Sequence, residues 1–237
     1  DWLLRRPNLD RPVVAMSIVS TTMLEAIAEA HDARCVQTLT GFKWIWDRAL
    51  GEVADGATFV FGFEEALGYC VGTVVRDKDG IGAAQVLMEL AADLKARGLT
   101  LLDHLDALYR THGLYLNEQV AVRLPGLDGR ARIEALMAGL RSRPPAEIAS
   151  VAVRRARDLA GVDAEEMGLP RSDVLIFDLV DGGRIVVRPS GTEPKLKSYL
   201  EVRERVGDEE SVTDARRRAE PRMAALAAWM DTVIGGE

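Results

Sequence analysis

Short apolar runs and helical segments alternate regularly along the first quarter of the chain. Runs rich in β-branched and apolar residues occupy 12–19, 35–39 and 58–62, and helical segments at 22–32 and 44–53 separate them. Strands joined by helices at this spacing lie parallel, because the crossover helix returns the chain to the same end of the sheet. The pattern therefore predicts an α/β domain with a mostly parallel sheet.

Start and stop signals mark the helices of this part. Thr22 and Glu25 have the spacing of a capping box. Asp79 is placed to cap a strong helix over 80–97, and Gly98 is a residue type that ends one. A further helix is predicted over 101–111. The apolar residues that repeat at helical spacing in the first of these helices are Ile81, Ala84, Leu87, Leu90, Ala91 and Leu94.

The pattern changes near residue 113. Asp181-Gly182-Gly183 is typical of a hairpin turn between two strands. Grouped strands with two flanking helices predict an α+β domain with an antiparallel sheet over 113–237, after the α/β domain of 1–112. The predicted strands are 114–124, 148–156, 173–180, 184–188 and 197–203, and the predicted helices are 129–141 and 208–231.

The charge balance argues against nucleic acid as a partner. Lys and Arg number 30 against 37 Asp and Glu, so the net charge is −7, and such a surface repels phosphate backbones at long range.

No apolar run approaches the ~20 residues of a membrane span. Cys35 and Cys70 have no metal-ligand spacing. We expect a cytoplasmic protein with reduced thiols and no membrane partner.

The segment RPSGTEPK at 188–195 joins two predicted strands and concentrates anion-binding groups. Arg188 can hold a phosphate through two parallel hydrogen bonds, and Gly191 lets backbone amides turn toward one anion. Ser190 and Thr192 add hydroxyl donors, and Lys195 adds positive charge. Many ordinary hairpins also contain Pro, Ser and Gly, so composition alone leaves both interpretations open.

Two further segments follow predicted strands at the edge where open α/β sheets bind ligands. In GFEEALGY at 62–69, Glu64 and Glu65 can accept hydrogen bonds from sugar hydroxyls; acidic residues are equally typical of a solvated helix start. In TGFK at 40–43, Lys43 can reach a phosphate or sugar oxygen, although a single loop lysine is usually solvated. Two carboxylates in DKDG at 77–80 make a weak metal set, so we predict no metal ligands in this chain.

These segments resemble the α-D-phosphohexomutases in a fixed order. RPSGTEPKLKSYLE at 188–201 is similar to the phosphate-binding loop of the family's last domain, and GFEEALGY is similar to the sugar-binding loop of its third domain. TLTGFKWI at 38–45 and VRDKDGIGAA at 75–84 resemble other third-domain segments of the phosphoglucomutase/phosphomannomutase branch. The resemblance covers essentially the whole chain.

The resemblance implies roles for the residues that match. Arg188, Ser190, Gly191, Thr192 and Lys195 would bind the phosphate that is not being transferred, while Glu64, Glu65 and Lys43 would bind the sugar. One departure is Ala66, where many members have Ser. The resemblance therefore does not fix the sugar, and glucose, mannose and pentose phosphates all remain open.

The resemblance also implies parts that the sequence lacks. The family interconverts hexose 1-phosphates and 6-phosphates through a phosphoserine and a bisphosphate such as glucose 1,6-bisphosphate, with Mg²⁺. Its serine loop, Thr-x-Ser-His-Asn-Pro, and its metal loop, Asp-x-Asp-x-Asp-Arg, occur nowhere in the 237 residues.

We expect the C-terminal half of a mutase, with no catalytic residue in this chain, inactive without the missing N-terminal domains. The chain begins without Met, and Trp2-Leu3-Leu4 resembles the last turn of a helix, which is typical of a fragment or a processed chain. The alternative is a stand-alone, non-catalytic module that binds sugar phosphates.

Overall fold

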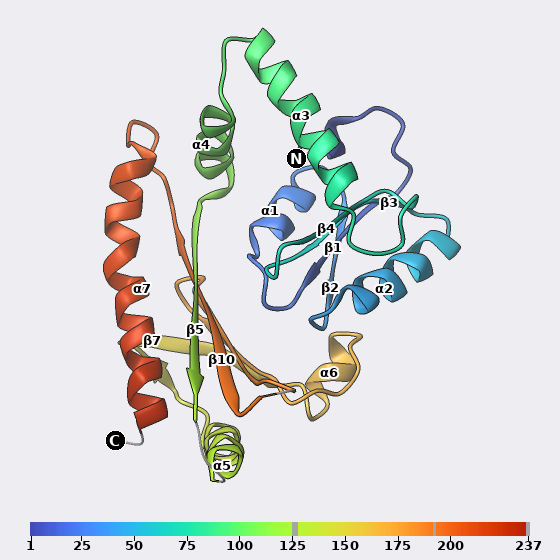
Figure 1. Cartoon of the computed structure of the whole chain (residues 1–237). Helices are drawn as coiled ribbons and strands as arrows, with labels where there is room; N and C mark the ends of the chain where they lie inside the picture. Colours follow the sequence, from blue (N-terminus) through green and yellow to red (C-terminus); the bar gives the residue numbers. More distant parts are fainter. Residues whose placement is uncertain (125–127, 192, 236–237) are drawn as a thin grey trace. The chain divides into compact units, whose positions relative to one another are not determined.

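A computed structural model describes residues 1–124, 128–191 and 193–235 (Figure 1). The chain divides into two compact units, Asp1–Gly113 and Leu114–Glu237. The first unit has a mostly parallel sheet with helices, and the second has an antiparallel sheet with helices. The fold class predicted from the sequence is confirmed.

Unit 1 is built on a four-stranded sheet in the order β2-β1-β3-β4. The first three strands are parallel, and β4 pairs antiparallel with β3 at the edge. A short 3₁₀ helix at Leu3–Arg5 precedes the sheet. The strands are β1 (Pro12–Ser17), β2 (Arg34–Thr38), β3 (Thr58–Glu64) and β4 (Gly68–Val71), and the helices are α1 (Met23–Glu29), α2 (Phe42–Ala54), α3 (Gly80–Ala96) and α4 (Leu101–His112).

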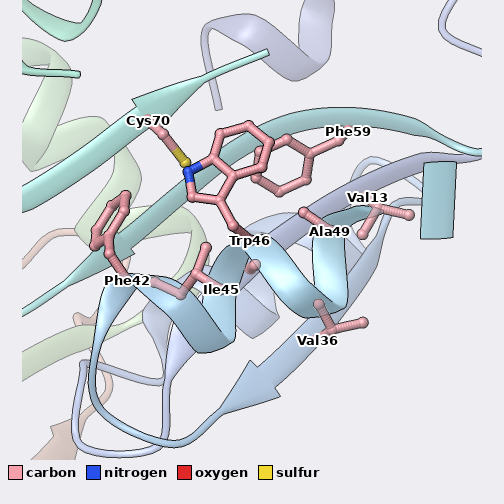
Figure 2. Packing of buried hydrophobic residues seen from close by; sticks show 9 residues of the cluster. Val13, Val36, Phe42, Ile45, Trp46, Ala49, Phe59 and Cys70 are labelled. Carbon is pink, nitrogen blue, oxygen red and sulfur yellow. The ribbon is translucent and has the colours of Figure 1, made fainter. Parts of the chain in front are cut away.

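Helix α2 covers one face of this sheet and forms the core of unit 1 with it (Figure 2). Ile45 and Ala49 of α2 are fully buried against Val13 of β1 and Phe59 of β3. The Trp46 ring meets the Phe59 ring edge to face, with ring centroids 5.4 Å apart. This packing fixes the N-terminus of α2 against the sheet edge where β3 ends.

The opposite face of the sheet is only partly covered. A hollow of about 690 Å³ lies there, and residues of the N-terminus, the sheet, α1, α3 and α4 line it. The apolar stripe predicted for α3 is largely open: Ile81 is 86% exposed and Leu87 is 52% exposed. Among the residues of α3, all of which are described, only Leu94 is buried.

Unit 2 is built on a six-stranded antiparallel sheet in the order β5-β10-β9-β8-β7-β6. Helix α7 runs alongside β5 and packs on β5 and β10 (Figure 1). The turn predicted at Asp181-Gly182-Gly183 joins β8 to β9. The strands are β5 (Leu114–Arg123), β6 (Glu147–Ile148), β7 (Val151–Asp158), β8 (Leu175–Leu179), β9 (Arg184–Pro189) and β10 (Lys195–Glu204), and the helices are α5 (Gly129–Ser142), α6 (Asp163–Glu166) and α7 (Val212–Gly235).

Helix caps differ from the sequence predictions at one point. Asp79 caps α3 as predicted, since its carboxylate accepts a hydrogen bond from the Gly82 amide at 2.8 Å. The capping box predicted at Thr22 and Glu25 is wrong: Thr22 makes no side-chain cap bond, and Glu25 pairs with Gln37 instead. A complete capping box lies at Thr100 and Asp103, at the start of α4.

Candidate functional site

The candidate site of unit 1 lies where the chain leaves the carboxyl ends of the parallel strands. Val13 of β1 packs toward α2, whereas Val14 faces the other way and lines the hollow together with Leu24 of α1. Because neighbouring side chains of a strand point to opposite faces, α1 and α2 lie on opposite faces of the sheet. The loops after β1 and β2, which lead to α1 and α2, therefore diverge, which is the arrangement that opens a ligand crevice in α/β sheets.

Glu64, at the end of β3, is buried and doubly bound. The residue is 5% exposed. Its Oε2 accepts a hydrogen bond from the Gly41 amide at 3.0 Å, and its Oε1 lies 2.8 Å from the Lys78 ammonium. The glutamate thus joins the end of β3 to the loop before α2 and to the segment before α3.

Glu65 is exposed and bound to the loop after β1. Its Oε1 accepts a hydrogen bond from the Thr21 amide at 3.2 Å. Its own amide donates to the Ser20 hydroxyl oxygen at 3.2 Å, and that hydroxyl lies 2.8 Å from the Ser17 hydroxyl. The structure therefore brings the predicted carboxylate pair together with three strand ends at one edge of the sheet.

Lys43 lies in the first turn of α2, two residues after the Gly41 amide that binds Glu64. Its side chain is exposed, and its ammonium lies 4.9 Å from the centre of the Trp44 ring. The lysine is therefore at the same sheet edge as Glu64 and is held by an aromatic ring rather than by a carboxylate.

Sequence reasoning missed both partners of Glu64, Gly41 and Lys78. Both stand inside segments that were singled out, TGFK and VRDKDGIGAA, but no local pattern linked them to Glu64.

The second group of predicted residues surrounds the hairpin between β9 and β10 in unit 2. Arg188 is half-buried near the end of β9, and Lys195 begins β10. The Ser190 amide donates to the Lys195 carbonyl oxygen at 2.7 Å and closes the loop. Gly191 is exposed, and a Cβ added there would meet no atom within 4 Å. Thr192 lies outside the described residues.

Strand register gathers basic side chains on one face of this sheet. Lys197 of β10 lies directly opposite Arg188 of β9, and Lys195 of β10 lies directly opposite Arg123 of β5. Directly opposed residues share a face, as do residues two apart in one strand. Leu196 between the two lysines is buried on the other face. Four cations therefore line one face beside the loop, a concentration of positive charge in an acidic protein.

One carboxylate stands among these cations. Glu193 in the loop accepts a hydrogen bond from Arg123 at 2.8 Å, and this bond lowers the pKa of Glu193 below its ordinary value. The glutamate therefore stays ionised to a lower pH than an unpaired glutamate would, and it offsets part of the local positive charge. Arg123 is a neighbour of the loop that the sequence did not single out.

Other titratable groups of unit 1 belong to packing rather than to the sheet edge. Burial raises the pKa of the Cys35 and Cys70 thiols to about 12. His31 and His104 lie 2.9 Å and 3.4 Å from the Asp1 carboxylate, and burial lowers the pKa of both imidazoles. Within residues 1–124, 128–191 and 193–235, no three His, Cys, Asp or Glu side chains are grouped to hold a metal ion, and no helix there could span a membrane.

Comparison with known families agrees with the two-unit division. The profile described as "Phosphoglucomutase/phosphomannomutase, alpha/beta/alpha domain III" matches residues 1–112. The profile of the same family's C-terminal domain matches residues 131–218. The chain belongs to the phosphoglucomutase/phosphomannomutase family.

Curated relatives support the same assignment. A probable phosphomannomutase of Haemophilus influenzae is 44% identical over 203 residues, covering 85% of this chain and 38% of the relative. A phosphoglucomutase of Staphylococcus aureus is 33% identical over 204 residues, covering 83% of this chain and 37% of the relative. The chain thus spans well under half the length of these relatives.

Solved structures share the fold. Parafusin, a phosphoglucomutase from Paramecium, superposes with a TM-score of 0.66 at 17% identity, covering 94% of this chain and 38% of that one. A phosphoglucomutase/phosphomannomutase family protein from Burkholderia thailandensis gives a TM-score of 0.54 at 14% identity, covering 97% of this chain and 41% of that one.

Proposed function

We propose that this chain supplies the sugar-recognising and phosphate-recognising parts of a mutase that interconverts hexose 1-phosphate and hexose 6-phosphate. One observation carries the proposal beyond family membership. Backbone amides that follow β1 and β2 converge on the two carboxylates at the end of β3, Thr21 on Glu65 and Gly41 on Glu64. Carboxylates fixed at this edge of a parallel sheet are placed to accept hydrogen bonds from sugar hydroxyls, and Lys43 adds a donor beside them.

The proposed phosphate site is the hairpin of unit 2. Arg188 would bind two phosphate oxygens through its planar guanidinium, while Ser190 and Thr192 donate from their hydroxyls. The amide of Gly191 would point at the same anion. Lys195 and the neighbouring basic face supply the charge that the acidic surface as a whole lacks. The phosphate held here would be the one that is not being transferred.

Phosphoryl transfer itself is assigned to the rest of the parent enzyme. The proposed reaction moves a phosphoryl group from a phosphoserine to the sugar and returns the other one from a bisphosphate. That step needs a positioned nucleophile and a cation that stabilises the transferring group. The 237 residues contain neither the serine loop nor the Asp-rich loop of the family. The chain should therefore bind the substrate. The Mg²⁺ ion should be held by another part of the parent enzyme.

Calorimetric titration with glucose 1,6-bisphosphate tests the phosphate site. Arg188→Ala removes a charged bidentate contact, which is worth about 1.5–3 kcal/mol, so affinity should fall more than tenfold. Arg130→Ala is the matched control, because Arg130 lies on α5 of the same unit with its side chain 88% exposed. The control should bind as the wild type does.

Two results would contradict the proposal in different ways. Equal affinity of Arg188→Ala and wild type would move the phosphate site away from the hairpin. Measurable mutase turnover by the purified chain would refute the assignment of catalysis to other domains. The alternative, a stand-alone binding module, would be favoured if the coding sequence before Asp1 lacked both the serine loop and the Asp-rich loop.

A further inference from the structure

Lys78 contacts three separate parts of the candidate sugar site. Its ammonium lies 2.8 Å from Glu64 Oε1 and donates to the Ala66 carbonyl oxygen at 3.5 Å. It also lies 5.7 Å from the centre of the Phe42 ring at the start of α2. One side chain thus joins the end of β3, the loop after it and the helix that packs beneath them.

Glu64 depends on a cationic partner because its carboxylate is buried. Its side chain is 6% exposed, and a buried carboxylate without a compensating cation is strongly destabilising. A carboxylate can accept about four hydrogen bonds, and the Gly41 amide and Lys78 account for one on each oxygen. A ligand hydroxyl that reaches Glu64 would meet the remaining lone pairs in a fixed direction.

The backbone around Lys78 is itself anchored on both sides. The Trp46 indole nitrogen donates to the Asp77 carbonyl oxygen at 3.2 Å. The Asp79 amide donates to the Tyr69 carbonyl oxygen at 2.6 Å, and the Asp79 side chain caps α3. The lysine therefore projects from a fixed point and not from a free loop.

Gly68 leaves the space through which Lys78 reaches Glu64. A Cβ at this position would lie 2.6 Å from Phe42, 2.8 Å from Lys78 and 2.9 Å from Glu64. All three distances are shorter than any normal carbon contact. The side chains of Phe42, Lys78 and Glu64 therefore pack directly against the glycine.

We propose that Lys78 is a positioning residue for sugar recognition: it holds the Glu64 carboxylate and the loop at 65–67 in the orientation that accepts the sugar hydroxyls. The inference rests on the proposed function, since it assigns Lys78 a role through Glu64. Lys78 acts on the sugar end of the ligand and leaves the hairpin of unit 2 untouched.

Calorimetry on five variants, one of them a control, tests this role, with glucose 1,6-bisphosphate and inorganic phosphate as probes. Lys78→Met should weaken bisphosphate binding about tenfold, as expected for a lost charge-assisted contact, and leave phosphate binding unchanged. Lys78→Arg should restore most of the affinity. Glu64→Gln should weaken binding, and adding Lys78→Met to it should have little further effect, because the two residues act as one unit. Lys95→Met, the same change in the last turn of α3, is the control.

Hydrogen exchange of the Gly41 amide gives a second measurement that needs no ligand. This amide donates to Glu64 Oε2, so displacing the carboxylate exposes it to water. Exchange should be about tenfold faster in Lys78→Met and near wild type in Lys78→Arg and Lys95→Met.

The outcomes separate the two proposals. If Glu64→Gln weakens bisphosphate binding but Lys78→Met does not, the positioning role is overturned and the proposed function stands. Equal weakening of both probes by Lys78→Met also overturns it, since the effect would not be confined to the sugar. If the wild-type chain binds neither probe, the proposed function fails for this chain, and unchanged Gly41 exchange in Lys78→Met would then overturn the inference on its own.

Discussion

The two units hold their candidate residues in different ways. In unit 1, Glu64 is buried and bound to a backbone amide and an ammonium from two other segments. In unit 2, Arg188 and Ser190 are half-buried and Gly191 is exposed at the end of a hairpin. The candidate residues of unit 1 are therefore held by packing, whereas those of unit 2 stand in a region of local positive charge. Thiol reactivity, glycine substitution and loss of the surface ion pair distinguish the two units.

The largest expected effect is on the reactivity of the two thiols. Both cysteines lie in unit 1, and both are withheld from solvent by its packing. Burial raises the pKa of Cys35 and Cys70 from 9.0 to about 12, and the thiolate is the reactive form. Alkylation by iodoacetamide at pH 8 should be about 1000-fold slower in the native chain than in denaturant. The native rate should rise with pH, since raising the pH increases the thiolate fraction. Mass spectrometry measures both rates, and similar native and unfolded rates would contradict a packed unit 1.

The next effect compares one glycine from each unit. Gly68→Ala forces a Cβ into contacts of 2.6–2.9 Å, and overpacking of this kind costs about 1–3 kcal/mol of unfolding free energy. Gly191→Ala in the hairpin meets nothing within 4 Å and should change stability by less than about 0.5 kcal/mol. Urea titration monitored by cysteine labelling reports unit 1, because both cysteines lie there. Urea titration monitored by hydrogen exchange of the β9 and β10 amides reports unit 2. Equal losses in the two variants would remove the distinction between the units.

The smallest effect concerns the ion pair beside the hairpin. Arg123 and Glu193 lie 2.8 Å apart, with side chains 63% and 46% exposed, and exposed ion pairs contribute little to stability. Arg123→Ala should therefore leave the urea midpoint nearly unchanged. A clear loss of stability would mean that charge in unit 2 holds the fold together and does not serve mainly for binding.

Long elements could be predicted from the sequence because their residues carry the pattern locally. The β-branched run at 12–19 became β1, and the helix predicted over 80–97 became α3. Short elements were missed, among them β4 and α6. The four residues of β4 (Gly68–Val71) form a strand only because β3 offers an edge to pair with, and α6 (Asp163–Glu166) is a single turn.

The candidate site could be predicted by residue type but not by contact. Glu64 follows a predicted strand, so its place at the sheet edge was foreseeable. Its partners come from 23 residues earlier, Gly41, and from the segment before α3, Lys78. Such pairs form only when the sheet brings separate loops together. A contact between distant residues also accounts for the missing capping box at Thr22. The side chain of its expected partner, Glu25, accepts a hydrogen bond from Gln37 of β2 instead.

The two contacts of Glu64 differ in how easily an amino-acid substitution can remove them. The Lys78 contact belongs to a side chain, so a single codon change can remove it. The Gly41 contact belongs to the main chain, and its φ of 118° favours glycine without making the amide depend on any side chain. A variant that loses the lysine therefore keeps half of the anchor, and its loop still starts in place.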